Sequence, residues 1–260
     1  IASKACLSDC GIQAADISEA LFGCVLSAGL GQAPARQAVL AAGVPDAVPT
    51  TTINKVCGSG MKAVHIGADM IRAGNAAIVL AGGMESMSNA PYLLPKARSG
   101  YRMGHQEVLD HMFYDGLQNP YDGQMMGIFG DATAKTYGFS RTEQDEFAIE
   151  SVQRALATAA AGTFAAELAP VTVKDRKGET LITSDEEPGR CDLKRIPTMR
   201  PAFAKDGTVT AATSSSISDG AASLLLMSEA EAQRRGLKPL ARIIGQASHA
   251  QDPAWFTTAP

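Results

Sequence analysis

The sequence predicts an α/β fold in which helices cover a parallel or mixed β-sheet. The first observation is that, up to residue 86, apolar or β-branched runs alternate with runs of helical periodicity. The second is that the same alternation returns after residue 217, behind a long stretch of different character. Such alternation is typical of sheets whose parallel strands are connected by helices.

Five elements are expected before residue 87, behind an opening helix that stops at Gly11. β-branched residues favour the strands, and Gly43 marks the end of the helix between the first two strands. The five elements are a strand and glycine turn at 17–31, a helix at 33–43, a strand at 48–56, a helix at 57–73 and a buried strand at 76–86.

Residues 87–217 are interpreted as an inserted lobe, because their first part is irregular and rich in Pro, Gly and basic residues. The clearest element of the whole chain lies here, a helix in which Ser140 and Glu143 form a capping box and Gly162 is the stop. A charged, hairpin-like excursion is expected at 174–190.

The α/β character then returns towards the end of the chain. The expected elements are a small-residue strand and turn at 208–220, a buried strand at 221–227, a helix at 228–236 with Ser228 and Glu231 as its capping box, and a strand at 239–250. The chain lacks an initiator Met, starts within a helix and closes on a loop-like segment, so we expect a fragment truncated at both ends.

Composition and charge restrict the class of protein. Apolar residues make up 45% and charged residues 19% of the 260, which is typical of globular proteins. The net charge of −4 argues against nucleic-acid binding, and no apolar run approaches the roughly 18 residues of a membrane span. The odd number and irregular spacing of the five cysteines predict reduced thiols in the cytoplasm and no metal site.

Cys57 lies where a predicted strand gives way to a predicted helix, in the segment NKVCGSGMKAV. A thiol at a helix start meets the positive end of the helix dipole, which favours the thiolate. The flanking glycines allow a substrate to approach the backbone, and the amide of Cys57 is suited to bind an oxyanion. Helical periodicity places it on a buried face together with Gly60, Met61, Val64, Ala68 and Ile71.

The residues alone leave two other interpretations of this segment open. Cys57 is also compatible with a small core side chain, the commonest role of a buried cysteine. The letters GSGMKA fit the glycine pattern of a dinucleotide-binding turn, with Glu85 as the ribose-binding acid. No base can be assigned to the thiol, because His65 lies about 12 Å along the same helix and the other three histidines stand in no motif.

Several segments, in the same order, resemble the thiolase family of acetyl-CoA acetyltransferases and 3-ketoacyl-CoA thiolases. The segments are AGLGQAPARQAVLAAGVP, NKVCGSGMKAV, AGGMESMSNAPY, FSRTEQDEFAIESVQRA, RPAFAKDGTVTAA and SDGAASLLLMSEAEAQRRGLKPLARI. The resemblance implies a thiolase-like βαβαβαββ half with an inserted α+β loop domain. It assigns residues 1–86 and 218–238 to the N-terminal half, 87–217 to the loop domain and 239–260 to the start of the C-terminal half.

The resemblance also implies an acyl-CoA acyltransferase that forms or cleaves a carbon–carbon bond between acyl-CoA units. Cys57 matches the cysteine that takes the acyl group as a thioester, which splits one difficult condensation into two easier steps. Acyl-CoA and CoA are the implied substrates, and no metal or other cofactor is implied. The family's Gly-His-Pro, second catalytic cysteine and Asn-Glu-Ala-Phe motifs do not occur in this sequence, so the chain as given is expected to be inactive.

Six further positions match substrate contacts of the family, along the path from the nucleotide to the acyl group. They are Arg190 near the nucleotide end, Ser215, Ala211 and Phe203 along the pantetheine arm, and Met126 and Phe256 at the acyl pocket. Each of these side chains also has an ordinary interpretation, in a turn, in the core or in solvent.

The basic loop at 93–105 matches the segment that pairs dimers into tetramers in the family, so a homodimer or homotetramer is expected. Two alternatives stay open. One is a related condensing enzyme such as a ketoacyl synthase, against which the Asn54-Lys55-Val56 lead-in and the inserted lobe argue. The other is a catalytically dead scaffold or dimerisation module of the same fold.

Overall fold

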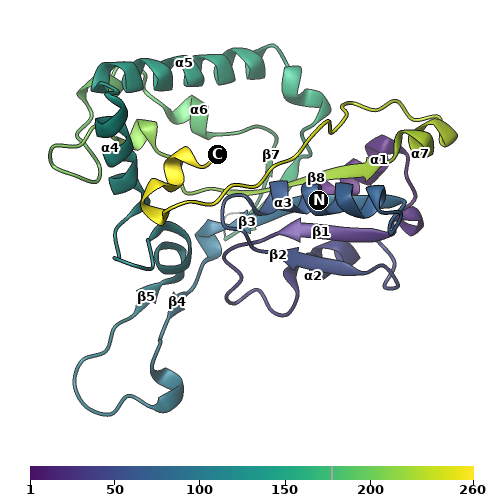
Figure 1. The fold of residues 1–260 in the computed structure, drawn as a ribbon, viewed down its shortest axis with the longest axis horizontal. Helices are drawn as coiled ribbons and strands as arrows, with labels where there is room; N and C mark the ends of the chain where they lie inside the picture. Colours follow the sequence, from purple (N-terminus) through teal and green to yellow (C-terminus); the bar gives the residue numbers. More distant parts are fainter. Residues whose placement is uncertain (177) are drawn as a thin grey trace. The chain divides into compact units, whose positions relative to one another are not determined.

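The computed structural model describes residues 1–176 and 178–260, which divide into two compact units (Figure 1). Unit 1 comprises Ile1–Gly116 and Ser218–Ala247, and unit 2 comprises Leu117–Ile217 and Ser248–Pro260. The units differ from the predicted domains in their bounds, since the predicted loop domain begins at residue 87. Because compactness alone does not define a domain, the predicted boundaries stay a prediction.

Unit 1 is built on a four-stranded mixed sheet with the strand order β2-β1-β3-β8. β1 (Glu19–Gly23) pairs in parallel with β2 (Thr50–Ile53) on one side and with β3 (Ile78–Ser86) on the other. β8 (Asp219–Met227) pairs antiparallel with β3 along its whole length. The predicted parallel or mixed sheet is therefore confirmed, and a strand from far along the chain completes it.

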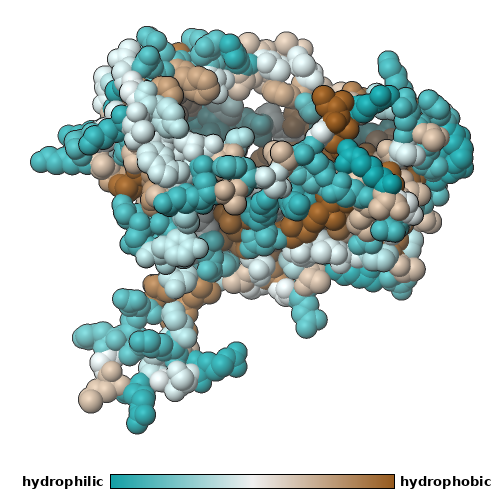
Figure 2. Space-filling model, viewed as in Figure 1, coloured by the Kyte–Doolittle hydropathy of each residue, from teal (hydrophilic) through white to brown (hydrophobic). Residues whose placement is uncertain are grey.

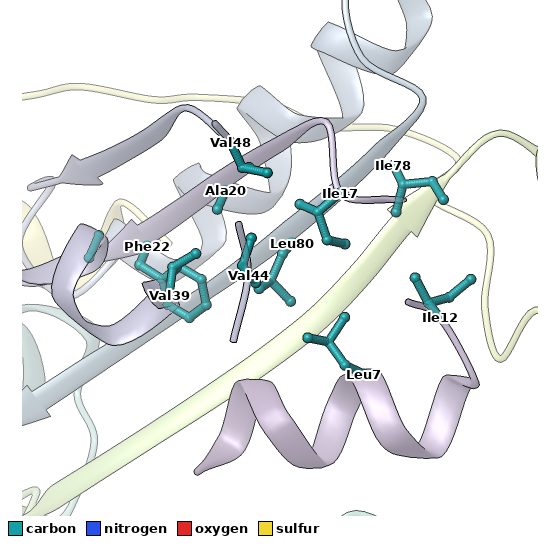
Figure 3. Packing of buried hydrophobic residues seen from close by; sticks show 11 residues of the cluster. Leu7, Ile12, Ile17, Ala20, Phe22, Val39, Val44, Val48, Ile78 and Leu80 are labelled. Atoms are coloured by element: carbon teal, nitrogen blue, oxygen red, sulfur yellow. The ribbon is translucent and has the colours of Figure 1, made fainter. Parts of the chain in front are cut away.

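Helices cover both faces of this sheet. α1 (Ala2–Cys10) and α2 (Pro34–Ala41) pack on one face, and α3 (Ser59–Arg72) packs on the other. Alternate residues of β1 and β3 point to opposite faces, as the two-residue period of a strand requires. The first face holds Leu7, Ala20, Phe22, Val39, Ile78 and Leu80 (Figure 3), and the second holds Leu21, Ala63, Val79 and Ala81.

Three smaller elements complete unit 1. β4 (Tyr92–Leu93) and β5 (Leu109–Asp110) form an antiparallel pair, and α7 (Glu229–Arg234) follows β8. The connection between β4 and β5 is a long loop whose surface is largely hydrophilic (Figure 1, Figure 2). It contains most of the segment that the resemblance assigns to pairing between dimers.

Unit 2 consists of helices and one hairpin. The helices are α4 (Met126–Tyr137), α5 (Arg141–Ala160) and α6 (Glu187–Arg190), and the antiparallel hairpin joins β6 (Val171–Asp175) to β7 (Gly178–Ile182). The hairpin confirms the predicted excursion, of which Lys177 lies outside the described residues. Among the helices that the structure describes, none combines the length and the apolar character of a membrane span.

The predicted capping signals are found at the helix starts. Ser140 and Glu143 form the reciprocal capping box of α5. At α7, Ser228 accepts a hydrogen bond from the amide of Glu231 at 3.1 Å. The Glu231 carboxylate turns instead to two neighbouring arginines, so half of the second predicted capping box forms.

Of the strand and turn predicted at 208–220, the strand is wrong up to residue 218, since β8 begins at Asp219. A 3-10 turn at Ala211–Thr213 lies there instead. The amides of Thr208 and Val209, which a strand would offer to its neighbour, bind the carboxylate of Asp131.

The strand predicted at residues 239–250 is also wrong. Leu240 and Ile244 are almost fully exposed, and within the described residues no strand lies beside this segment to complete its backbone hydrogen bonds. The predicted strand at 221–227 forms within β8, but Leu224 is 52% exposed because β8 is an edge strand.

Candidate functional site

Cys57 lies in the turn between β2 and α3, and its side chain is exposed. α3 begins at Ser59 rather than at Cys57, with Gly58 as its N-cap. The prediction that Cys57 lies on the buried face of the helix is therefore wrong, and so is the interpretation as a core side chain. An exposed thiol is accessible to a reactant, as a nucleophile must be.

The buried face of α3 is made of small residues. Ser59, Ala63 and Gly67 are buried, whereas Met61, which was predicted to lie on this face, is 67% exposed. A Cβ atom on Gly67 would lie only 2.9 Å from Cγ1 of Val79 in the sheet. The helix thus approaches the sheet so closely at Gly67 that no side chain fits there. Ala68 is buried and Val64 and Ile71 pack against the core, as predicted, whereas Met61 is exposed.

The first turn of α3 also lies directly against the end of β1. A Cβ atom on Gly23 would lie 2.7 Å from the Cβ atom of Ser59 and 2.7 Å from the amide nitrogen of Gly60. Real Cβ atoms do not approach other heavy atoms so closely, so this crossing requires glycine. The position of the turn before α3 is therefore fixed by contact with the sheet.

The backbone immediately before Cys57 is strained. Val56 has a φ of +47°, in the left-handed region that a β-branched residue rarely adopts. Its amide donates a hydrogen bond to Oδ1 of Asn54 at 3.0 Å, and its carbonyl accepts one from the hydroxyl of Ser59 at 2.5 Å. Strain of this kind costs about 1–3 kcal/mol and persists where surrounding contacts maintain it, often at functional sites.

Cys24 and Cys6, unlike Cys57, are wholly or partly shielded from solvent. Burial, with a further contribution from the Glu85 carboxylate, raises the pKa of Cys24 to about 11. Burial, together with the neighbouring Cys10, raises the pKa of Cys6 to about 12. Thiols that stay protonated at neutral pH are poor nucleophiles, so these two cysteines are structural.

The carboxylate of Glu85, at the end of β3, is occupied by hydrogen bonds within the protein. Its carboxylate accepts hydrogen bonds from the amides of Val25 at 3.0 Å and Leu26 at 2.9 Å, and the thiol of Cys24 lies 3.9 Å away. It thereby fixes the segment that follows β1. The dinucleotide interpretation requires this carboxylate for a ribose hydroxyl, so the structure speaks against that interpretation.

Two of the four histidines, His111 and His249, have hydrogen-bond partners in the part of the chain that the structure describes. His111 is 5% exposed, accepts a hydrogen bond from the amide of Ala28 on Nε2 at 3.3 Å, and contacts Asp115 through Nδ1 at 2.5 Å. Because Nε2 accepts, Nδ1 carries the proton and donates it to the carboxylate. Among the described residues, no hydrogen bond or ion pair joins a histidine to the thiol of Cys57.

The seven predicted site residues are divided between the units, with Cys57 in unit 1 and the other six in unit 2. Within unit 2, three of the six lie along α4. Met126 is the first residue of this helix, and the ring of Phe203 covers Gly127, where a Cβ atom would lie 2.1 Å from it. Phe256 packs edge-to-face on Phe129 of the same helix, with ring centroids 5.9 Å apart.

Ala211 and Ser215 lie just beyond a segment that α4 also holds. The amides of Thr208 and Val209 bind Asp131 of this helix at 2.7 and 2.8 Å. Both Ala211 and Ser215 are exposed. Three of the six predicted substrate contacts thus lie along α4, and the segment that precedes Ala211 and Ser215 is bonded to the same helix.

Arg190 is the exception. It ends α6, which packs on α5, and its guanidinium forms an ion pair with Glu186 at 3.0 Å in an exposed position. In residues 1–176 and 178–260, no group of three or more His, Cys, Asp or Glu side chains could hold a metal ion.

Ser59, Glu85 and Asp131 shape these sites and were not predicted to do so. Their signal in the sequence is a polar side chain at a helix start, at a strand end or within an apolar helix. The amide partners of Glu85 and Asp131 lie 59 and 77 residues away for Leu26 and Thr208. A single sequence does not reveal such pairs.

The chain matches a protein-family model described as the N-terminal domain of thiolase over residues 1–230. An acetyl-CoA acetyltransferase of Pseudomonas aeruginosa is 48% identical over 98% of the chain, and one of Schizosaccharomyces pombe is 47% identical over 100% of it. The chain spans 65% and 66% of the length of these two curated relatives.

A crystal structure of a thiolase from Ascaris suum in complex with coenzyme A is similar in fold, with a TM-score of 0.92 and 39% identity. The match covers 99% of this chain and 66% of that one. The expected thiolase-like α/β fold is therefore confirmed.

Proposed function

Because the chain belongs to the thiolase family, we propose that it supplies the nucleophilic cysteine of an acyl-CoA acyltransferase. The enzyme would form or cleave a carbon–carbon bond between acyl-CoA units, with acetoacetyl-CoA or a longer 3-ketoacyl-CoA as the β-keto species. One observation supports this proposal above the others. Cys57 is the exposed member of the five cysteines, on a strained turn directly before a helix.

The chemistry proposed for Cys57 is thioester exchange. The thiolate attacks the carbonyl carbon of an acyl-CoA, and the carbonyl oxygen becomes an oxyanion that backbone amides are suited to stabilise. The bond between that carbon and the CoA sulfur then breaks, CoA leaves as its thiolate, and the acyl group stays on Cys57. A second acyl-CoA, deprotonated at its α-carbon, attacks this thioester and releases the cysteine.

We also propose that this chain does not turn over by itself. The three motifs that supply the family's other catalytic groups do not occur in its 260 residues, and no histidine of the described part contacts the thiol. Acylation of Cys57 needs a thiolate and an acyl-CoA, whereas deprotonation of the second acyl-CoA needs a base. The first step is therefore the one that these residues can support.

Coenzyme A binding is proposed for the α4 group in unit 2. The thiolase of Ascaris suum was solved in complex with coenzyme A. Met126, Phe203 and Phe256 lie along α4, and Ala211 and Ser215 follow a segment bonded to it. We propose that these five residues line the pantetheine and acyl ends of the ligand. Arg190 is proposed to meet the nucleotide end from α6.

Three properties expected from the resemblance stay proposals. They are a homodimer or homotetramer, a location in the cytoplasm, and independence of any metal or organic cofactor. The competing candidate is a catalytically dead scaffold of the same fold, which would neither be acylated nor bind CoA.

Acyl trapping tests the proposed function. The chain is incubated with acetyl-CoA at alkaline pH, where an ordinary thiol ionises without a base, and acetylation is followed by intact-mass and peptide mass spectrometry. We expect one acetyl group on Cys57, lost in Cys57→Ala and retained in the control Cys191→Ala. Equal labelling of the chain and of Cys57→Ala would contradict the proposal and favour the scaffold.

A further inference from the structure

Asp131 of α4 binds two successive backbone amides with one oxygen atom. Its Oδ1 accepts hydrogen bonds from the amide of Thr208 at 2.7 Å and from that of Val209 at 2.8 Å. Hydrogen bonds to a charged acceptor are shorter and stronger than those between neutral groups. This carboxylate is therefore a firm attachment point for a segment that has no strand partner of its own.

The second carboxylate oxygen shows how closely the two parts fit. Oδ2 of Asp131 is buried and makes no hydrogen bond within the described residues. A Cβ atom on Gly207 would lie 2.3 Å from this oxygen and 2.6 Å from Cγ. The segment thus lies so close to the carboxylate that only glycine fits at position 207. Leaving Oδ2 of Asp131 buried without a hydrogen-bond partner costs free energy.

The chain before this point is attached to unit 2 at further places. Arg141 of α5 donates hydrogen bonds to the carbonyls of Ile196 at 3.1 Å and Met199 at 2.8 Å. The amide of Ala202 bonds the carbonyl of Val209 at 2.9 Å. Gln144 reaches the hydroxyl of Thr208 at 3.0 Å. The whole approach to residue 210 is therefore fixed.

Hydrogen bonds connect Thr210 to the residues that follow it in the chain. Thr210 is 0% exposed, and its amide and carbonyl bond the hydroxyl of Thr213 at 2.8 and 3.3 Å. The hydroxyl of Ser214 donates to the same carbonyl at 2.7 Å. A shift at residues 207–210 is accordingly passed to the turn at Ala211–Thr213, which begins with Ala211, and to Ser214, which is next to Ser215.

We infer that Asp131 is a positioning residue for the CoA-binding segment, which it sets in place through the amides of Thr208 and Val209. The inference rests on the proposed function, because Ala211 and Ser215 are proposed and not established contacts. It goes beyond that function in assigning a role to a carboxylate that touches neither the reacting atoms nor, as proposed, the ligand. Asp131 fixes residues 208 and 209 by hydrogen bonds, and the proposed CoA contacts Ala211 and Ser215 follow directly in the chain.

Calorimetric titration with CoA tests this role on the full chain, for wild type, Asp131→Ala and Asp131→Asn. The amide oxygen of asparagine can still accept both hydrogen bonds, whereas alanine accepts none. We expect Asp131→Ala to weaken CoA binding about tenfold, as the loss of charge-assisted hydrogen bonds would do, and Asp131→Asn to stay within about threefold. Glu143→Ala, which removes the acceptor in the capping box of α5, serves as a control that lowers the melting temperature without changing CoA affinity.

Gly207→Ala gives a second measurement that does not depend on removing the carboxylate. The new methyl group collides with Asp131, so we expect this variant to weaken CoA binding in the wild-type background. In the Asp131→Ala background the methyl group has room, and we expect it to change the affinity by less than about twofold. An effect of Gly207→Ala on CoA affinity that does not act through Asp131 would be additive and would not disappear in the double variant.

Three outcomes would overturn the inference. One is unchanged CoA affinity in Asp131→Ala while the amides of Thr208 and Val209 exchange hydrogen faster, since the attachment would then be irrelevant to binding. Another is an additive effect of Gly207→Ala. The third is absence of CoA binding in the wild-type chain, which would overturn the proposed function itself and is thereby distinguished from the other two.

Discussion

The hydroxyl oxygen of Ser59 lies 2.8 Å from the amide nitrogen of Lys55 and accepts its hydrogen bond. The same hydroxyl donates to the carbonyl of Val56. One buried side chain at the start of α3 thus closes the turn that presents Cys57. Hydrogen bonds of the residues on both sides hold the exposed thiol in place, whereas within the described residues the thiol itself makes no hydrogen bond.

Substitution Ser59→Ala should therefore loosen this turn. It leaves the amide of Lys55 without its partner, which costs about 1–3 kcal/mol, whereas the carbonyl of Val56 keeps the backbone amide of Ser59 at 3.0 Å. We expect a lower urea midpoint and a changed alkylation rate of Cys57 by iodoacetamide. Ser99→Ala, which removes an exposed hydroxyl bonded to Lys96, is the control; if both variants behave alike, the closure of the turn by Ser59 is unimportant.

The backbone strain at Val56 lowers the free energy of unfolding of the wild type, so a substitution that relieves it should stabilise the chain. Val56 is 51% exposed, so replacing it loses little buried surface. Asparagine tolerates the left-handed region better than a β-branched residue. We expect Val56→Asn to raise the free energy of unfolding by about 0.5–1 kcal/mol. Val108→Asn, at a similarly exposed position without positive φ, should bring no gain, and a loss at both positions would contradict the claim of strain.

Gly82 in β3 should be intolerant of any side chain. A Cβ atom there would lie 2.2 Å from the carbonyl oxygen of Ala222 in β8 and 2.6 Å from the ring of Phe22. We expect Gly82→Ala to destabilise the chain by about 3 kcal/mol or more, because backbone and a core ring must both move. Gly220→Ala, where nothing lies within 4 Å, should leave the urea midpoint nearly unchanged, and equal effects would refute the packing argument.

Low pH should remove the contribution of the Glu231 carboxylate to the free energy of unfolding. Its hydrogen bonds with Arg234 and Arg235 lower the pKa of this carboxyl from 4.5 to about 2. A lowered folded-state pKa means stability that is present above about pH 4.5 and lost as the pH falls towards 2. We expect Glu231→Gln to be less stable than wild type near neutral pH, with the difference vanishing towards pH 2 and shrinking in high salt. Glu146→Gln, an exposed carboxylate on α5, is the control, and a difference between wild type and Glu231→Gln that does not change with pH would contradict the linkage.

The sequence predicts correctly those elements whose caps or apolar runs lie within the element itself. α5 was located with both of its ends, because Ser140, Glu143 and Gly162 act on the backbone within a turn of the helix. β3 was recognised by its continuous apolar run, since it is buried on both faces. The segment around Cys57 was identified by its glycines and by resemblance, which need no knowledge of the packing.

Elements that depend on distant partners were not predicted. The predicted face of α3 is right for Ala68, Val64 and Ile71, which are buried or pack against the core. It is wrong for Cys57 and Met61, which are exposed. The small-residue strand predicted within 208–220 does not form before Asp219. Its amides are taken by Asp131, 77 residues earlier for Thr208.

The sequence by itself determined the alternation of strands and helices, the helix caps and the reactive segment around Cys57, because these depend on neighbours within a few residues. The tertiary structure alone decided that this thiol is exposed, that Glu85 serves the backbone, and that Asp131 holds the chain before Ala211. Each of these depends on how closely two segments far apart in sequence approach one another. That distance is set by packing, which no local pattern encodes.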